Sequence, residues 1–365
     1  MRVQKKRRIL IIGNPVQTKS SDTFMRKIIG LLYPISEHMY IISGSTLEVS
    51  EDRVVFAKIN IPFKRFLIIS ILYQIKTITT IRKLKNKIDV VVLFPEYLLL
   101  TLIFLRLLNK RVIFFVGSKP LKTMMLLGKI TAMLSDIVVF ESTGVMKDWY
   151  QQPPPEIIHK AFVLPLSSII NRKTFTVLHP ISRRRGICIG YIGRLIPEKG
   201  ILIFTKAIPR VVETERNIQI IIIGEGPLKT RIVEYLQGIN KEKVRVSSWV
   251  SHDDLPKVLN QLKLLVIPSF SEGGPNILFE SMACGVPVLA SKVGAVVDVI
   301  IDKKNGFILQ ETTPDQIAKN IKEILENPKR LYKVSRMGVN TIDYQYNINK
   351  INERLSRIFM HTFGM

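Results

Sequence analysis

The stretch PSFSEGGPNILFESMACGVPVLA, residues 268–290, decides the fold of this chain more clearly than any other. Apolar runs before it (KLLVIP) and at its end (VPVLAS) predict two strands, joined by a helix that begins near Pro275 and ends at Gly285. A strand, a glycine-rich turn and a helix N-terminus form a site for anions, because backbone N–H groups and the helix dipole face the ligand. Glu272 and Glu280 lie beside this turn, and carboxylates accept hydrogen bonds from hydroxyls. A ligand with phosphates and hydroxyls, such as a nucleotide sugar, is therefore predicted.

Both halves of the chain alternate between continuous apolar segments and helical ones. The apolar segments are RILIIG, MYIISG, DVVVLF, RVIFFVG and DIVVFES in the first half, and GICIGYIG, IQIIIIGEG, VRVSSWV and KLLVIP in the second. Strands that are apolar throughout and separated by helices belong to parallel sheets covered on both faces. The fold class is therefore α/β. Pro209 is expected to kink or shorten a helix over residues 200–214.

Composition favours a globular protein of two domains. The chain has 365 residues, of which 47% are hydrophobic and 23% charged, and this length is too great for one typical core. Cys188 and Cys284 lie in separate apolar segments, so we expect a reducing, cytoplasmic compartment and no disulfide framework. The most apolar helical segment, residues 97–108, contains Arg106 and is too short to span a bilayer.

Two further glycine turns follow predicted strands in the second half. In GYIGRLIPEKG, Gly193 permits a tight turn, and Arg194 and Lys199 can reach one side of it, where two cations would neutralise a diphosphate. A solvated surface loop explains this segment equally well. In IIIGEGPLK, Gly224 and Gly226 allow the backbone to approach a ligand closely, although many α/β proteins have such a turn.

The remaining polar features each have a structural alternative. The alternative for Glu272 is a loop glutamate that faces solvent, and the alternative for Glu280 is a helix glutamate bonded to a neighbouring residue. The order of turn, proline and helix favours a ligand site instead. The turn at Asn305 and Gly306 fits a hairpin-like turn before a strand as well as it fits a contact with a nucleotide.

The segments GRLIPEKG, IGEGPLK, PSFSEGGPNILFESMACGVPVLAS, VGAVVDVI and NGFIL follow one another in this order. Together, over about residues 186–345, they resemble the C-terminal domain of glycosyltransferase family 4 (glycosyl transferases group 1), the retaining sugar-nucleotide transferases of GT-B architecture. The resemblance implies two Rossmann-like domains that face each other across a cleft, with a C-terminal helix crossing back to the first. With the polar, basic stretch 171–185 as linker, we expect an acceptor-binding domain over 1–170, a donor-binding domain over 186–345 and a tail helix over 346–365.

The resemblance also assigns roles to residues of the donor half. Arg194 and Lys199 match the positions that bind the donor diphosphate, and Glu272 matches the glutamate beside the donor sugar; these three are the expected catalytic residues. Glu280 matches the glutamate that holds the ribose hydroxyls. The other expected donor-binding residues are Gly193, Gly224, Gly226, Gly274, Pro275, Asn276 and Ile277. The family uses neither metal nor cofactor, and no His/Cys/Asp cluster in this sequence points to a metal.

Two departures from the family pattern lie in the first half. Family members often carry a histidine after the strand that here reads RVIFFVGSKP, where this chain has Gly117, and a glycine pair in the first loop, where GNPVQTKSSDTF has only Gly13. The catalytic groups on the acceptor side are therefore not predicted. The missing histidine motivates an alternative, a non-catalytic, membrane-associated protein that binds a nucleotide sugar. A GT-B sugar-nucleotide epimerase is another alternative, whereas a phosphorylase would need a phosphate or pyridoxal-phosphate site that the sequence does not show.

The chain is strongly basic, with a net charge of +25. Residues 58–87 carry eight Lys or Arg and no acid, and the helix predicted over 64–87 is amphipathic. Such a helix can lie on an anionic membrane surface, but it also fits an ordinary sheet-covering helix with a basic polar face. Nucleic acid is not expected, because aromatic residues are not interleaved with the charges. We expect a peripheral protein at the inner face of the membrane, with an acceptor that is lipid-linked or a cell-surface glycan precursor.

Overall fold

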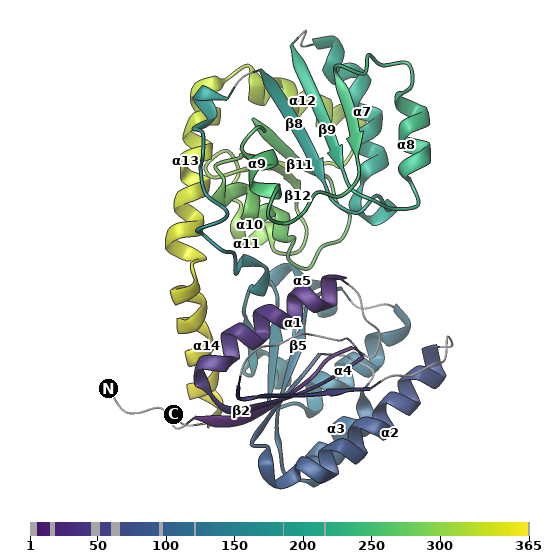
Figure 1. Cartoon of the computed structure of the whole chain (residues 1–365), viewed down its shortest axis with the longest axis vertical. Coiled ribbons are helices and arrows are strands. Elements are labelled where there is room, and N and C mark those ends of the chain that lie inside the picture. Colours follow the sequence, from purple (N-terminus) through teal and green to yellow (C-terminus); the bar gives the residue numbers. More distant parts are fainter. Residues whose placement is uncertain are drawn as a thin grey trace. The chain divides into compact units, whose positions relative to one another are not determined.

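The computed structural model of the chain describes residues 6–14, 19–44, 52–59, 66–94, 98–119, 122–184, 186–214 and 217–363. It divides into two compact units, of which the first comprises Met1–Leu166 and Ile351–Met365 and the second Ser167–Lys350 (Figure 1). Three predicted features fall partly outside the described residues: the helix start at Lys64, the apolar segment from Tyr97, and the first loop at residues 15–18. Each unit is built around its own parallel sheet.

The first unit holds a seven-stranded sheet in the order β3-β2-β1-β4-β5-β6-β7. Every neighbouring pair is parallel, and the order reverses between β1 and β4, as in doubly wound folds. The strands are β1 (Arg7–Ile12), β2 (Ser36–Ser43), β3 (Val54–Lys58), β4 (Val90–Leu93), β5 (Arg111–Val116), β6 (Ile137–Phe140) and β7 (Ala161–Val163).

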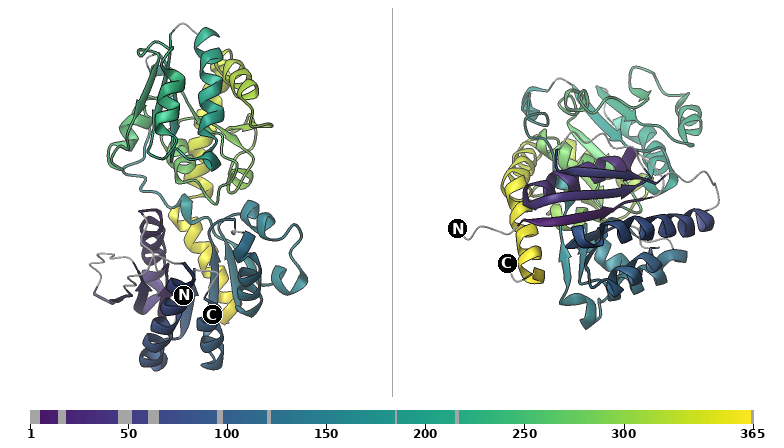
Figure 2. Two further views of the ribbon diagram at one scale, coloured as in Figure 1. Left: turned by 90° about the vertical axis from the view of Figure 1, so that its right-hand side faces the viewer. Right: turned by 60° about the horizontal axis from the view of Figure 1, so that its bottom comes forward.

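Helices cover both faces of this sheet, which explains why its strands are apolar throughout. On one face, Leu10 and Val91 pack with Tyr73 of α2 and Leu102 of α3. On the other, α1 and the C-terminal helix α14 converge over β4 and β5 (Figure 2). The helices are α1 (Lys19–Leu32), α2 (Phe66–Leu84), α3 (Leu99–Leu107), α4 (Met125–Leu134), α5 (Thr143–Trp149), α6 (Pro155–Ile158) and α14 (Ile348–Phe363).

The second unit holds a six-stranded sheet in the order β10-β9-β8-β11-β12-β13, again parallel throughout. Its strands are β8 (Ile187–Ile192), β9 (Ile218–Ile223), β10 (Val244–Ser247), β11 (Leu264–Ile267), β12 (Val288–Ser291) and β13 (Phe307–Leu309). Two parallel sheets in one chain confirm the predicted α/β class.

Two buried clusters lie on opposite faces of the second sheet. One centres on Phe204 of α7 and Ile317 of α12, and the other on Phe279 of α10. The helices are α7 (Ile201–Thr214), α8 (Lys229–Leu236), α9 (Leu255–Leu259), α10 (Asn276–Ala283), α11 (Val296–Val299), α12 (Pro314–Leu325) and α13 (Pro328–Gln345).

Residues 171–185, predicted as a linker, belong to the second unit. Arg172 pairs with Asp343 of α13 at 2.8 Å, and the backbone N–H of Leu178 donates to the Asn260 side chain at 2.8 Å. Polar side chains without periodicity therefore mark a segment that is tied down by hydrogen bonds.

One helix and one strand differ from the sequence prediction. Helix α7 runs through Pro209 without being shortened, because its buried face, with Phe204 and Ile208 fully buried, offsets the cost of an interior proline. Strand β3 is missing from the prediction, because it is a half-exposed edge strand rather than a continuous apolar core strand.

No helix in the described part of the chain combines the length and the apolar character that crossing a membrane would require.

Candidate functional site

The predicted donor residues lie on loops at the carboxyl edge of the second sheet. Gly193 and Arg194 follow β8, Gly224 follows β9, and Glu272 lies in the loop after β11. Strand order reverses between β8 and β11, and in open parallel sheets ligands bind outside the strand ends at such a switch point. The topology therefore gathers these separate segments at one place.

The glycines after β9 let two loops pack backbone to backbone. A Cβ atom on Gly224 would lie 1.9 Å from the carbonyl oxygen of Gly193, and one on Gly226 would lie 2.4 Å from that of Leu195. The N–H of Leu195 donates to the carbonyl of Glu225 at 2.9 Å. The loops after β8 and β9 thus form one fixed surface, and this packing accounts for both glycines even without a ligand.

Tyr191 supports the turn that carries Arg194. Its hydroxyl donates to the carbonyl oxygen of Arg194 at 2.9 Å, beneath Gly193, where a Cβ would lie 3.3 Å from that hydroxyl. Burial raises the pKa of Tyr191; the negative charge of Glu272 raises it further, and the Arg194 guanidinium opposes them. Arg194 is itself exposed to solvent. The charges of Arg194 and Glu272 thus act in opposite directions on this hydroxyl.

Lys199 and Glu272 form a short ion pair at the centre of this site. The Lys199 Nζ lies 2.6 Å from Glu272 Oε2, and the two side chains are 19% and 7% exposed. Ser269 donates to the other carboxylate oxygen at 2.7 Å. Both oxygens of Glu272 are thereby held, and a cation and an anion are fixed beside the Arg194 turn.

The two loops that carry this ion pair are fixed against each other. Gly200 has φ +64°, and a Cβ there would lie 1.9 Å from the carbonyl oxygen of Pro268. Beside it, the N–H of Phe270 donates to the carbonyl of Glu198 at 2.9 Å. A residue other than glycine at position 200 would force the loops apart, because it meets backbone rather than a flexible side chain.

The turn after Glu272 leads directly into helix α10. The carbonyl of Gly273 accepts from Ala295 at 2.8 Å, and the carbonyl of Gly274 accepts from the Ser167 hydroxyl at 2.6 Å. Pro275 is the N-cap, and α10 begins at Asn276, followed by Ile277, as the sequence predicts. The N–H groups of a first helical turn point along the axis away from the helix, which makes this end electropositive.

Glu280 lies on the second turn of α10 and is 5% exposed. Its Oε1 is 3.1 Å from Nε2 of His252, whose side chain is 66% exposed. The ring of His252 contacts the ring of Phe175, with centroids 4.9 Å apart. Glu280 thus has a partner at the surface, whereas Glu272 has its partners inside the loop cluster.

Three residues of this site are absent from the sequence prediction: Tyr191, Ser269 and His252. Ser269 precedes Glu272 by three residues, a spacing that allows a hydroxyl to reach a carboxylate within one loop. Tyr191 is part of an apolar strand, and its hydroxyl carries no pattern in the sequence. His252 comes from another loop, so only the fold shows that it reaches Glu280.

The two positions at which the first unit departs from the family pattern lie at strand ends. Gly13 follows β1 and Gly117 follows β5, both at the carboxyl edge of the first sheet. The carbonyl of Gly13 accepts from the Tyr73 hydroxyl at 2.8 Å. Within the described residues, no group of three or more His, Cys, Asp or Glu side chains could hold a metal ion.

Residues 182–341 match the model of the family described as Glycosyl transferases group 1. The second unit therefore carries a domain of that family. A curated relative from Methanocaldococcus jannaschii, "Uncharacterized glycosyltransferase MJ1178", is 28% identical over 137 residues. That match covers 38% of this chain and 38% of the relative, so the similarity is confined to well under two thirds of the relative's length.

Solved structures resemble the whole chain in fold. The crystal structure of Anabaena Alr3699/HepE in complex with UDP has a TM-score of 0.78 at 15% identity, covering 96% of this chain and 98% of that one. Sucrose-phosphate synthase from Thermosynechococcus elongatus has a TM-score of 0.79 at 16% identity, covering 98% and 99%. With the two parallel sheets, these neighbours confirm the predicted GT-B architecture of two Rossmann-like domains.

Proposed function

We propose that this protein is a retaining glycosyltransferase, which moves a sugar from a nucleoside-diphosphate sugar to an acceptor hydroxyl. The observation that carries the proposal is the Lys199–Glu272 ion pair, half-buried at Lys199 and buried at Glu272, in loops that also carry the exposed Arg194, at the strand-order switch of a glycosyl transferases group 1 domain. This arrangement offers two cations for a diphosphate and a fixed carboxylate for a sugar.

Each charged residue would have a separate task. Arg194 would bind the diphosphate with its fork of donors, and Lys199 would share its charge between Glu272 and the phosphate. Together with the N-terminus of α10 they would neutralise the charge that develops on the leaving nucleoside diphosphate, a task for which other enzymes use a metal ion. No metal and no cofactor is part of this proposal.

The remaining residues would hold the donor. Glu272 and the backbone of residues 274–277 would orient the sugar, and Glu280 would accept hydrogen bonds from the ribose hydroxyls. The surface formed by Gly193, Gly224 and Gly226 would lie under the diphosphate. A UDP sugar is the first donor to test, because a structural neighbour has been solved with UDP-glucose.

The acceptor would be lipid-linked, with the protein peripheral on an anionic, cytoplasmic membrane face. Helix α2 carries exposed apolar side chains at Ile71 (44% exposed) and Ile75 (51%), and the neighbouring α3 exposes Leu107 (79%). Five cations between positions 76 and 87 lie on the same helix and the turn that follows it. An exposed apolar strip with cations beside it is suited to the surface of an anionic bilayer.

The decisive test is turnover with a panel of nucleotide sugars and lipid-linked acceptors, with EDTA present. Release of nucleoside diphosphate and an NMR spectrum showing the donor's anomeric configuration in the product would support the proposal. Inversion at the anomeric carbon would contradict the retaining step. Donor binding without turnover on every acceptor would identify a non-catalytic binding protein, and a changed sugar on the same nucleotide an epimerase.

Membrane association needs a test of its own. Vesicles of phosphatidylcholine with anionic lipid should retain the protein at low salt and release it at high salt, because the attraction is screened. Lys83→Gln/Lys85→Gln should weaken retention, while Lys257→Gln, an exposed cation of the second unit, should not. Equal retention by neutral vesicles would contradict the electrostatic part of the proposal.

A further inference from the structure

A hollow lined by cations lies in the second unit, at the edge of its sheet opposite the candidate donor site. It is about 500 Å³ in volume. The turn that forms one side precedes β13, so it lies at the amino edge, whereas the donor loops follow their strands. Five of the six lining residues are cationic, namely Lys303, Lys304, Lys329, Arg330 and Lys333, and the sixth is Met337.

The cations project from two supports that are fixed to each other. Lys303 and Lys304 belong to a turn organised by the buried Asn305, whose Oδ1 accepts from the N–H of Ile301 at 2.7 Å. Asn305 Nδ2 donates to Thr341 Oγ1 of α13 at 3.0 Å, and α13 carries the other three cations. Lys303 has φ 59°, a strained conformation for a lysine, where glycine or asparagine would fit more easily.

None of these five cations forms an ion pair within the described residues, although cations elsewhere do, such as Arg8 with Asp89 and Arg210 with Asp315. Like charges held together repel, and the N-terminus of α13 adds positive potential. A concave group of exposed cations without an acid in its own lining therefore attracts an anion.

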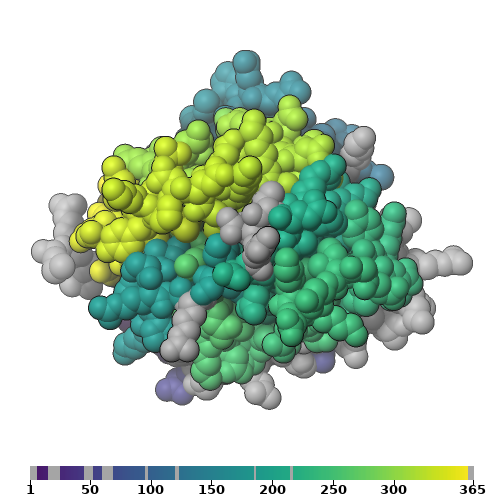
Figure 3. Space-filling model, turned by 90° about the horizontal axis from the view of Figure 1, so that it is seen from above, coloured from purple at the N-terminus to yellow at the C-terminus, as the bar shows by residue number. Residues whose placement is uncertain are grey.

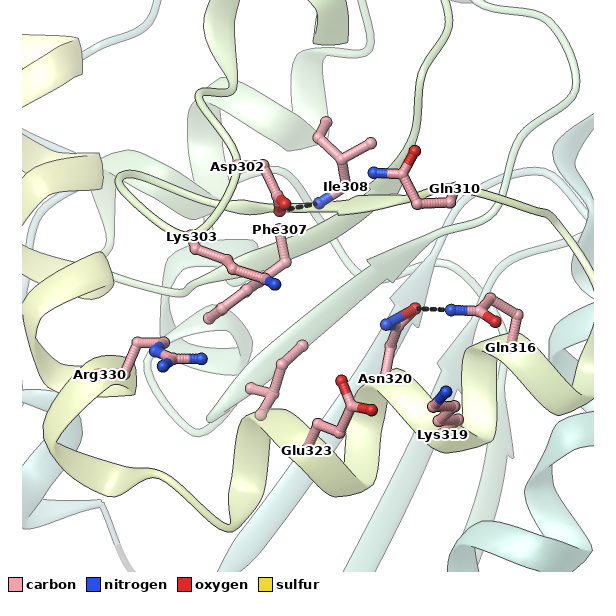
Figure 4. Close-up of a pocket in the computed structure, with 11 residues that line it drawn as sticks. Asp302, Lys303, Phe307, Ile308, Gln310, Gln316, Lys319, Asn320, Glu323 and Arg330 are labelled. Carbon is pink, nitrogen blue, oxygen red and sulfur yellow. Dashed lines mark hydrogen bonds between the residues drawn. The ribbon is translucent and has the colours of Figure 1, made fainter.

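A second hollow of about 190 Å³ adjoins the first and shares Lys303 and Arg330 with it. Figure 4 shows that its lining is rich in amides, with Gln310 and Asn320 among them. Gln316 donates to Asn320 at 3.1 Å, and Asp302 and Glu323 complete the polar wall. Amides donate and accept hydrogen bonds, so this wall suits the part of a ligand that carries several hydroxyls.

We propose that the two hollows together bind a phosphomonoester of a polyhydroxy compound, such as a sugar phosphate. The phosphate lies among the five cations, and the hydroxyls bond to the amide wall. Helices α12 and α13, which line the site, lie at the molecular surface (lime to yellow in Figure 3), so a soluble ligand has access. The site is separate from the donor loops and does not depend on the proposed transferase activity.

Calorimetric titration with glucose 6-phosphate, inorganic phosphate and glucose tests this assignment. Glucose 6-phosphate should bind more tightly than inorganic phosphate, and glucose should not bind detectably. Lys329→Gln/Lys333→Gln should weaken binding about 100-fold, roughly tenfold for each lost charge-assisted hydrogen bond. Gln316→Leu should remove the preference for glucose 6-phosphate over inorganic phosphate.

The controls separate this site from the donor site and from net charge. Lys206→Gln/Lys257→Gln removes two exposed cations elsewhere in the unit and should leave binding unchanged, as should Arg194→Ala. No binding of glucose 6-phosphate, or equal binding by the Lys329/Lys333 variant, would overturn the proposal. Retention on phosphatidic acid vesicles without binding of glucose 6-phosphate would overturn it in favour of a lipid headgroup.

Discussion

The carboxyl edges of the two sheets have the same topology and different chemistry. In the second unit the loops after β8 and β11 are joined by the Lys199–Glu272 ion pair and pack closely at the left-handed Gly200, while a serine hydroxyl holds Glu272 within its own loop. In the first unit, Gly13 and Gly117 follow the corresponding kind of strand, and the described bonds to them are neutral, such as that from Tyr73 to Gly13. The described residues place an ion pair at the second edge and, at the first, a buried carboxylate, Glu141, that accepts from the N–H of Leu166 at 3.1 Å.

This difference indicates where binding energy for an anion would come from. Strand order alone places a crevice at both edges, and the described residues of the second edge add fixed charges of both signs to it. We therefore expect substitutions at the second edge to weaken binding of the donor diphosphate, and the substitutions compared below in the first unit, Gly30→Ala and Tyr150→Phe, to leave it unchanged.

The largest expected effect is on turnover. Arg194→Ala and Lys199→Ala should each lower kcat by about 100- to 1000-fold, since each removes a cation from the charge on the leaving group. Lys199→Ala should also lower stability, because Glu272 keeps Ser269 but loses its ion-pair partner. Rates of nucleoside diphosphate release measure the first effect and urea unfolding the second. Lys257→Ala is the control, and wild-type turnover in both active-site variants would refute the assignment.

The second expected effect is on stability and compares one glycine in each unit. Gly200→Ala should lower the free energy of unfolding by about 3 kcal/mol, because its φ of +64° and a backbone atom 1.9 Å from the new Cβ both oppose a side chain. Gly30→Ala should raise stability by up to about 1 kcal/mol, since Gly30 lies in α1 with nothing within 4 Å of a Cβ. Equal changes in the urea midpoint of the Gly200→Ala and Gly30→Ala variants would contradict this prediction.

The same contrast explains how much the sequence could predict. Apolar strands, the Pro275 start and Gly285 stop of α10, and the order of glycine turns are local signals, and the fold follows them. The partners of Glu272 and Glu280 are not local: Lys199 is 73 residues from Glu272, and His252 is 28 from Glu280. Segment 171–185 shows the same limit: its polar residues suggest a linker, and only the fold shows contacts with distant residues such as Asn260 and Asp343.

A smaller effect on the free energy of unfolding is expected from substitution of two buried tyrosines, one in each unit. Tyr191→Phe should cost about 1 kcal/mol of stability, because it removes the bond to the Arg194 carbonyl. Tyr150→Phe should be neutral or stabilising, because the buried Tyr150 hydroxyl has no hydrogen-bond partner among the residues that the structure describes. Comparable losses in both variants would contradict the assignment.

The pH dependence at the same two tyrosines follows from burial. Burial raises the pKa of Tyr150 to about 12 and raises that of Tyr191 as well. The unfolded chain releases these protons near pH 10, earlier than the folded one, so stability is full below about pH 10 and falls as the pH rises above it. Alkaline unfolding monitored by circular dichroism should begin at higher pH in Tyr150→Phe than in the wild type, and an unchanged onset would contradict this linkage.

The smallest expected effect is on the contact between His252 and Glu280 at the donor edge. His252→Asn should change the KM for the donor by less than about threefold, because the histidine is 66% exposed and such surface pairs contribute little. Glu280→Gln, measured beside it, should raise KM clearly more, since the ribose hydroxyls would lose a charged acceptor. Steady-state kinetics with a fixed acceptor distinguish the two. A kcat loss in His252→Asn as large as that in Lys199→Ala would mean that charge at both glutamates, and not only at Glu272, takes part in the reaction.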